Sequence, residues 1–266
     1  MTEIAERAAK ALNDPENWPE DPKEAVARQR LLASRVRSEP FDAGAVDLVC
    51  GLDVSYGVND TELAAAAVVL DARTLEVVDT SLIADTPSFP YISGLFGFRE
   101  LPPVLKAIEG LSLTPDVFVS DGFGLAHPRR FGVASHLGVL LDARVVGSAK
   151  TVLYGRNTLP GEERGSWTPM VAGRSELVED TERLAAQGAE VIGRTLRTRA
   201  RTKPVYVSVG HRVDLEGACD LILRVSPRYR IPEPIRHADR LCGRYRKEHK
   251  AAMERSSTEG NATEQG

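Results

Sequence analysis

The chain has few of the features that stabilise small extracellular folds. Its 266 residues include only three cysteines, at positions 50, 219 and 242, and no CxxC pair. Such wide spacing argues against a disulfide framework and against a structural zinc site. No run of 18 apolar residues occurs, and residues 1–10 are polar, without the apolar core of a signal peptide. We therefore expect a cytoplasmic globular protein with no membrane partner.

The acidic charge is concentrated at one end of the chain. The net charge is −4, and residues 1–24 alone hold seven acidic and three basic side chains. The remainder is neutral but contains two basic segments, residues 194–203 with five Arg and Lys and residues 228–255 with nine. Basic segments on a neutral body can follow a phosphate backbone. On charge alone, an ordinary solvated surface is the simpler interpretation.

The chain divides into three parts by composition. Residues 1–21 are expected to be a loosely attached acidic arm broken by prolines, residues 22–250 a single domain, and residues 251–266 a disordered tail without apolar periodicity. The domain begins with a helix signal, in which Asp21 is the N-cap and Pro22 the first helical residue. This helix is predicted to run to about Ser38 and to bury Ala25, Leu32 and Val36.

The middle of the domain alternates between strand and helix patterns. Strands are predicted at residues 46–56, 63–71, 75–84, 116–120 and 143–147, and helices at 93–110, beginning or kinking near Pro102, and at 132–141. The first three strands form an antiparallel meander because their links are short. The order βββαβαβ then predicts an α/β fold, a mixed sheet extended by parallel crossovers and flanked by helices.

The last third is predicted to complete this sheet. We expect an acid-rich helix at residues 176–187, a hairpin of residues 191–198 and 204–209, and a closing helix from about Leu215. The segment 156–173 has no clear periodicity and is predicted to be a mobile surface loop.

Three acidic residues occupy positions that a hydrophobic core disfavours. Asp53 lies inside an apolar strand, Asp121 ends another strand, and Glu100 lies in the helix between them. A buried carboxylate is costly unless it is paired or bound to a cation. Converging carboxylates suit Mg²⁺ or Mn²⁺. Their placement on the first strand, first helix and fourth strand is that of ribonuclease-H-like nucleases, which indicates metal-assisted phosphoryl chemistry.

Segments around these acids resemble the endonuclease V family, the deoxyinosine 3′-endonucleases. The longest are GLDVSY at 51–56, FPYISGL at 89–95 followed by FRE at 98–100, and DGFGLAHPRRFGVASHLG at 121–138. The series is completed by Lys150, VSVGHR at 207–212, and YRIPEP at 229–234 with Arg236, Ala238 and Asp239. All of them occur in the order of the family, over about residues 24–244.

The resemblance implies a role for each matching polar residue. Asp53 and Asp121 would ligate Mg²⁺, with Mn²⁺ as a substitute, and Glu100 would complete the acidic site directly or through metal-bound water. Lys150 and His211 would lie beside the scissile phosphate. The implied reaction is hydrolysis of the second phosphodiester bond 3′ to deoxyinosine, which leaves 3′-hydroxyl and 5′-phosphate ends.

The resemblance also implies a region that recognises the damaged base. Tyr91 would be a wedge that enters the nucleic acid beside the lesion, and the deaminated base would be turned out of the stack into a pocket. The other residues that shape the wedge loop and the pocket are Pro90, Ile92, Gly94, Gly122 and His127. The implied partner is double- or single-stranded DNA with deaminated bases, bound by a monomer.

Two departures from the family pattern leave alternatives open. Ser93 stands where the family usually has a second proline, which predicts a more mobile wedge loop. Phe123 stands where a histidine is common, which predicts an altered rate, metal preference or substrate range. The alternatives are an endoribonuclease specific for inosine in RNA and a lesion-binding protein that has lost catalysis. A nucleotide-binding domain is disfavoured because Gly122-Phe123-Gly124 lacks the further glycine of a dinucleotide fingerprint.

Overall fold

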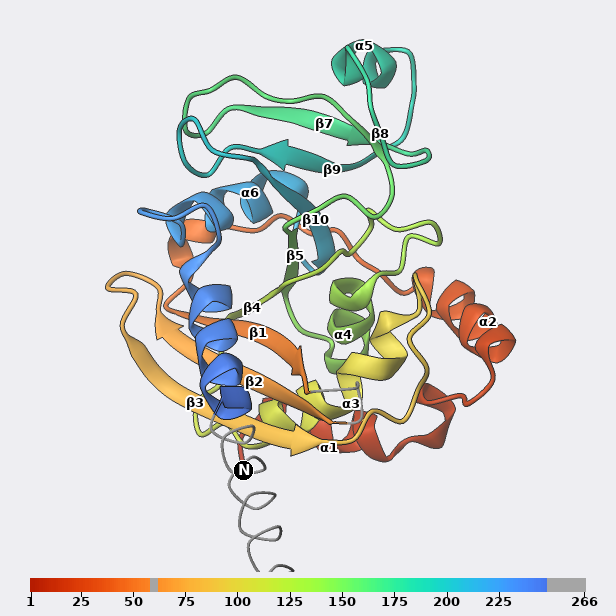
Figure 1. The fold of residues 1–266 in the computed structure, drawn as a ribbon, viewed down its shortest axis with the longest axis vertical. Coiled ribbons are helices and arrows are strands. Elements are labelled where there is room, and N and C mark those ends of the chain that lie inside the picture. Colours follow the sequence, from red (N-terminus) through yellow and green to blue (C-terminus); the bar gives the residue numbers. More distant parts are fainter. Residues whose placement is uncertain (58–61, 248–266) are drawn as a thin grey trace, which may run out of the picture.

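The computed structural model describes residues 1–57 and 62–247 (Figure 1). The helices are α1 (Glu3–Asn13), α2 (Pro22–Ala33), α3 (Phe96–Glu109), α4 (Val133–Leu141), α5 (Thr181–Ala186) and α6 (Leu215–Arg224), and residues 233–247 are also helical. The strands are β1 (Leu48–Tyr56), β2 (Leu63–Asp71), β3 (Val77–Asp85), β4 (Val117–Ser120), β5 (Val145–Ala149), β6 (Arg156–Asn157), β7 (Trp167–Val171), β8 (Glu176–Leu177), β9 (Val191–Leu196) and β10 (Val205–His211).

The described strands form one mixed sheet in the order β3-β2-β1-β4-β5-β10-β9-β7-β6-β8. The meander β1–β2–β3 is antiparallel, and β4 and β5 then run parallel to β1. This confirms the predicted α/β class and the succession of meander and crossovers. Strand β3 begins two residues later than predicted because Leu75 (φ 61°) still belongs to the turn.

Helices cover both faces of the meander, and β2 shows why its sequence is apolar throughout. Ala65, Ala67 and Val69 face a cluster formed with α1, α3 and α4. The alternate residues of β2 face α6 and the helix at 233–247 (Figure 1). A strand buried on both sides needs an uninterrupted apolar run rather than an alternating one.

The N-terminal segment is not the loosely attached arm that its prolines suggested. Residues Glu3–Asn13 form α1, which begins with Thr2 as N-cap. Ile4, Ala8 and Ala11 are buried in the cluster with α3 and α4. Acidic residues lie on the outer side of an amphipathic helix, so a count of charges missed the apolar stripe that docks it.

Helices α2 and α3 both differ in length from their predictions. Asp21 caps α2 as predicted, by accepting from the backbone N–H groups of Lys23 and Glu24, but the helix ends at Ala33. Helix α3 begins at Phe96, six residues before Pro102, so a start near the proline pair is wrong, and the alternative of a kink there stays a prediction. The buried apolar stripe of α3 outweighs the helical hydrogen bonds that the prolines cannot donate.

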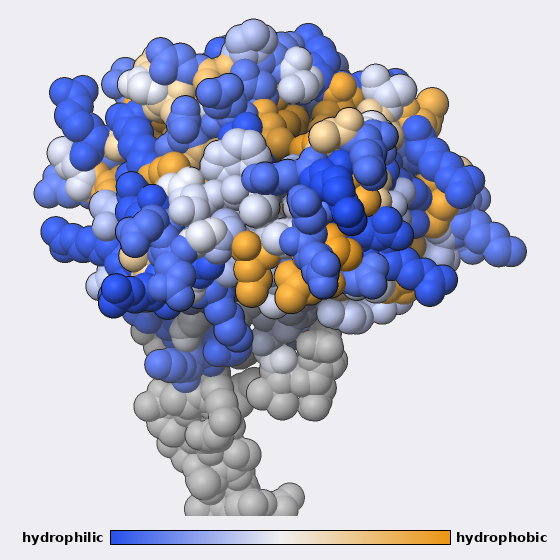
Figure 2. Space-filling model, turned by 90° about the horizontal axis from the view of Figure 1, so that it is seen from above, coloured by the Kyte–Doolittle hydropathy of each residue, from blue (hydrophilic) through white to orange (hydrophobic). Residues whose placement is uncertain are grey.

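The segment 156–173 is part of the sheet rather than a loop. Within it, β7 pairs antiparallel with β9, and β6 pairs with both β7 and β8. The hairpin β9–β10 is confirmed, whereas the acid-rich helix shrinks to α5. Strands β6–β9 extend the sheet beyond β10 and are called the extension below. Its exposed apolar side chains include Leu159, Leu177 and Val191. On the face seen in Figure 2, hydrophobic residues lie in groups between hydrophilic ones.

No helix in residues 1–57 and 62–247 has the length and apolarity required to cross a bilayer. The predicted tail at 251–266 lies outside the described residues.

Candidate active site

Three neighbouring parallel strands carry predicted site residues toward the same edge of the sheet: Asp53 lies within β1, whereas Asp121 and Lys150 directly follow β4 and β5. Leu52 of β1 pairs with Ser120 of β4, so the following residues, Asp53 and Asp121, are neighbours. Strand β5 pairs beside β4 and ends one residue before Lys150. Adjacent strands lie about 4.8 Å apart, so this register alone brings two carboxylates and an ammonium group together.

Asp53, Glu100 and Asp121 line a single cavity of about 180 Å³. Burial, reinforced by the negative charge of Asp121, raises the pKa of Asp53 to about 8. Burial raises the pKa of Glu100 to about 7, although a hydrogen bond from Tyr56 acts in the opposite direction. The carboxyl groups therefore resist ionising together, and a cation in the cavity would relieve that resistance.

Lys150 supplies a positive charge beside Asp121, in the lining of a second, neighbouring cavity. Its Nζ lies 2.6 Å from Oδ2 of Asp121. Burial opposes the charge on Lys150, but Asp121 and Asp53 outweigh this effect and raise its pKa. Among the described residues, no three Asp, Glu, His or Cys side chains converge closely enough to hold a metal ion in this arrangement. The donor set, carboxylate oxygens around a polar cavity, nevertheless has the chemistry that Mg²⁺ prefers.

Two further residues act on the acidic cluster and were given no role by the sequence. The Tyr56 hydroxyl donates to Oε1 of Glu100 over 3.0 Å, which fixes that carboxylate from the end of β1. Asp239, in the helix at 233–247, lies near enough for its charge to raise the pKa of Asp53 and of Lys150. Both residues occur in the segments that match the family. The sequence did not show that their side chains lie near the acidic residues.

His211 does not join this cluster, so the structure does not bring it together with Lys150, with which it was expected to share a position beside the scissile phosphate. Strand β10 runs antiparallel to β5, and His211 pairs with Val145 at the far end of β5. Four residues of strand separate that level from Ala149, or about 13 Å.

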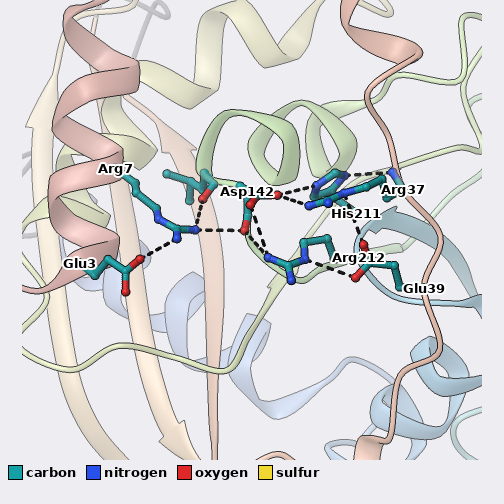
Figure 3. A network of polar contacts seen from close by, with 8 residues as sticks. Glu3, Arg7, Arg37, Glu39, Asp142, His211 and Arg212 are labelled. Atoms are coloured by element: carbon teal, nitrogen blue, oxygen red, sulfur yellow. Dashed lines mark hydrogen bonds and ion pairs between the residues drawn. The ribbon is translucent and has the colours of Figure 1, made fainter.

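His211 is instead part of a polar network on the opposite edge of the sheet (Figure 3). Its Nε2 donates to Asp142 over 3.3 Å, and its Nδ1 accepts from the backbone N–H of Arg37. Arg37 and Arg212 also pair with Asp142. Burial lowers the pKa of His211. This network connects the end of β10 with α4 and with the segment that leads into β1.

The predicted wedge loop, residues 89–95, leaves its aromatic side chain in solvent. Tyr91 is 66% exposed, and its ring centroid lies 4.8 Å from that of Phe96. Pro90 is exposed and Ile92 is half-buried beside it. The loop closes in a turn, in which the Leu95 N–H donates to the Ile92 carbonyl and Gly94 has φ +80°. A left-handed residue at this position identifies a type II turn.

A second cavity, of about 380 Å³, opens beside the acidic one and includes Gly94, Gly122 and His127 in its lining. His127 is committed to the protein, because its Nε2 donates to the Gly94 carbonyl and its Nδ1 accepts from the Arg129 N–H. Burial, with the charge of Arg129, lowers the pKa of His127 to about 4, so the ring is neutral.

The loop after Asp121 packs closely on β10. A Cβ at Gly124 would lie 1.9 Å from the Val209 carbonyl, so this loop needs glycine at that position.

The family model for endonuclease V matches residues 30–240. The chain belongs to the endonuclease V family. An endonuclease V from Streptomyces avermitilis is 46% identical over 88% of this chain and 96% of its own, with a TM-score of 0.78 for its crystal structure. Human endonuclease V is 30% identical over 86% of this chain and all of its own, with a TM-score of 0.73. Endonuclease V from Ciona intestinalis, solved with a 24-mer DNA containing an inosine followed by a ribo-adenosine, is 29% identical over 85% and 98% of the two chains, with a TM-score of 0.68.

Membership confirms the ribonuclease-H-like fold and makes the chain a nuclease acting on phosphodiester bonds. The two departures from the endonuclease V pattern, Phe123 and Ser93, lie at the larger cavity and in the wedge loop. Phe123 packs in an apolar cluster with Met170 and Ile192 of the extension while lining the larger cavity. Ser93 occupies the second position of the turn, where proline is favoured.

Proposed function

We propose that this protein is a Mg²⁺-dependent repair endonuclease that recognises deoxyinosine in DNA and hydrolyses the second phosphodiester bond on its 3′ side. The products would carry 3′-hydroxyl and 5′-phosphate ends. The observation that carries the proposal is the junction of two cavities, since Glu100, Asp121 and Val133 line both of them. One cavity has the charge for a metal ion, and the other has room for a base.

The acidic cavity would perform the hydrolysis. Asp53 and Asp121 would hold the metal ion, and Glu100 would complete the site, held in place by Tyr56. Mg²⁺ bound there would stabilise the charge that develops on the phosphoryl group and lower the pKa of a bound water. Lys150 is half-exposed beside Asp121 and lines the larger cavity. On substrate binding it would exchange its Asp121 partner for a phosphate oxygen, as a point charge that follows the backbone.

The larger cavity would receive the extruded base. Gly94 and Gly122 have no side chains that would fill this cavity. The exposed ring of Tyr91 can occupy the gap that the extruded base leaves in the base stack. Extrusion costs a few kcal/mol and least for a poorly paired base, so part of the selectivity arises before any contact is made. A wedge loop and a base-sized cavity both occur within the described residues of a single chain, which suits action as a monomer.

The alternative substrate is RNA containing inosine, and the alternative function is binding without cleavage. The Ciona intestinalis complex holds a ribonucleotide after the inosine. In that complex the position after the lesion holds a ribose, and this observation supports the RNA alternative. The presence of Asp53, Glu100, Asp121 and Lys150 at one edge favours catalysis over binding alone.

The test is nicking of a labelled duplex with one deoxyinosine, with Mg²⁺ and with EDTA, beside a matched inosine RNA. Nicking one nucleotide beyond the lesion, only with the metal, supports the proposal. The variant Asp121→Ala should bind the duplex and fail to cut it. Wild-type protein that binds the lesion but cuts neither strand in Mg²⁺ or Mn²⁺ would refute the catalytic assignment. Cleavage of RNA alone would replace DNA repair by RNA processing.

A further inference from the structure

One backbone carbonyl beside the larger cavity accepts hydrogen bonds from three side chains. The Gly94 oxygen lies 2.9 Å from Nε2 of Gln29, 3.0 Å from Nε2 of His127 and 2.8 Å from Nη2 of Arg129. A carbonyl oxygen has two lone pairs, so this one has no acceptor capacity left for a ligand. These hydrogen bonds therefore fix the position of Gly94, and with it the end of the wedge loop.

Gln29 is the one of these donors that comes from another part of the fold. It lies in α2, is 2% exposed and lines the larger cavity. Its Nε2 also donates to the Phe131 carbonyl over 3.2 Å, and its Oε1 accepts from Nε of Arg129 over 2.5 Å. A single buried amide thus joins α2, the wedge loop and the loop that follows Asp121. It precedes residue 30, where the match to the family model starts.

The other end of the wedge loop is fixed independently. Nη1 of buried Arg99 donates to the Phe89 carbonyl over 2.6 Å. Tyr91, between the two attachments, remains 66% exposed. The loop is thus held at both ends with its aromatic side chain free. Losing the Gly94 attachment would release the half of the loop that borders the cavity and leave the Phe89 end in place.

We propose that Gln29 is a positioning residue for lesion recognition, which keeps the wedge loop and the cavity wall in the geometry that the extruded base requires. The inference rests on the proposed function. Gln29 is absent from the lining of the acidic cavity, so it acts on binding and not on the hydrolytic step. Preorganisation of a binding surface lowers the entropy lost when the ligand is bound.

The kinetic test replaces Gln29 by methionine, which has a similar length and no amide. Gln29→Met should raise KM for the deoxyinosine duplex about 10-fold, the order expected when a binding wall is misplaced, with kcat unchanged within about twofold. Gln29→Glu keeps the acceptor for Arg129 but loses both donors, so it should shift KM in the same direction.

Asn17→Leu is the matched control. Asn17 is also a buried amide, which donates to the Ala11 carbonyl and accepts from Arg28, next to α2 but away from both cavities. It should lower the melting temperature as Gln29→Met does and leave KM unchanged. A rise in KM equal to that of Gln29→Met would show a general effect of stability and overturn the proposal. So would a fall in kcat with KM unchanged in the Gln29 variants.

A second readout does not depend on cleavage of DNA. Chymotrypsin should cut after Tyr91 at least about 10-fold faster in Gln29→Met than in wild type, because local opening exposes the backbone to the protease. Adding Ser93→Pro should restore both protease resistance and KM, since proline fixes the turn that Gln29 otherwise holds. An unchanged rate of proteolysis would refute the role of Gln29 in holding the wedge loop. If the wild-type protein fails to nick deoxyinosine DNA but chymotrypsin still cuts Gln29→Met faster than wild type, the proposed function is refuted. The role of Gln29 in holding the wedge loop is then still supported.

Discussion

Metal binding to the acidic cavity should release protons near neutral pH. Burial and the mutual repulsion of the carboxylates raise the pKa of Asp53 to about 8 and that of Glu100 to about 7. A metal ion binds the ionised forms, so each protonated carboxyl must lose its proton on binding. Affinity should therefore rise as the pH rises through these values and level off above about pH 9, where both groups are largely ionised.

The magnitude follows from the two pKa values. At pH 7 a group with a pKa of about 8 is about 0.9 protonated and one with a pKa of about 7 about 0.5 protonated, so about 1.4 protons should leave per metal ion bound. Between pH 6 and pH 7 the affinity should rise about 50-fold, and the rise should approach about 100-fold per pH unit at lower pH. The assay is calorimetric titration of Mn²⁺ or Mg²⁺ at several pH values, in two buffers whose ionisation enthalpies differ.

Tyr56→Phe provides the control for this measurement. The Tyr56 hydrogen bond lowers the pKa of Glu100, so its loss should leave Glu100 more protonated and increase the protons released at pH 7 by up to about 0.5. An affinity that does not change between pH 6 and pH 8, together with equal heats in the two buffers, would show that the carboxylates are ionised before the metal binds. Asp53 and Glu100 would then not hold protons near neutral pH.

Three further variants test other parts of the structure. His211→Ala should leave nicking within about twofold and lower the free energy of unfolding by about 1–3 kcal/mol, through loss of buried hydrogen bonds; a large loss of kcat with unchanged stability would return His211 to the active site. Ser93→Pro should raise the free energy of unfolding by about 0.4–1 kcal/mol in urea titrations, because it restricts the unfolded chain at a turn position that proline fits; destabilisation would mean that the turn differs from type II. Burial, reinforced by Arg28, lowers the pKa of His136 from 6.5 to about 3, so its stability contribution is present above pH 6.5 and is lost as the pH falls toward 3. Between pH 6.5 and pH 5 this loss amounts to about 2 kcal/mol, and His136→Phe should abolish it when unfolding is compared at the two pH values; an equal pH dependence in both proteins would count against the assignment.

The acidic site could be predicted from the sequence because the strands that carry its residues have directions that are fixed locally. The short turns of the meander make β3 parallel to β1, and the crossover through α3 makes β4 parallel to β3, so β1 and β4 are parallel. Asp53 and Asp121 then emerge at one edge without any knowledge of side-chain contacts. The α1 segment escaped prediction for the opposite reason. Its acidic residues and flanking prolines are visible in the sequence, whereas the hydrophobic surface that holds Ile4 and Ala8 is formed by distant parts of the chain.

His211 shows where such reasoning stops. The strand pattern of residues 205–211 and its hairpin with β9 were both predictable, but the neighbour of β10 on its other side was not. Between β5 and β10 the chain passes through the β6–β9 extension, and a connection of that length fixes neither the partner of β10 nor its direction. Had β10 run parallel to β5, His211 would lie beside Lys150; because it runs antiparallel, Tyr206 pairs with Ala149 there instead. Gln29 is the converse case, since its sequence position gives no signal, and only the folded chain shows three loop and helix segments meeting on one amide. Motif residues thus mark the chemistry of this nuclease, while the groups that hold its recognition loop in place have to be sought among contacts that cross between elements.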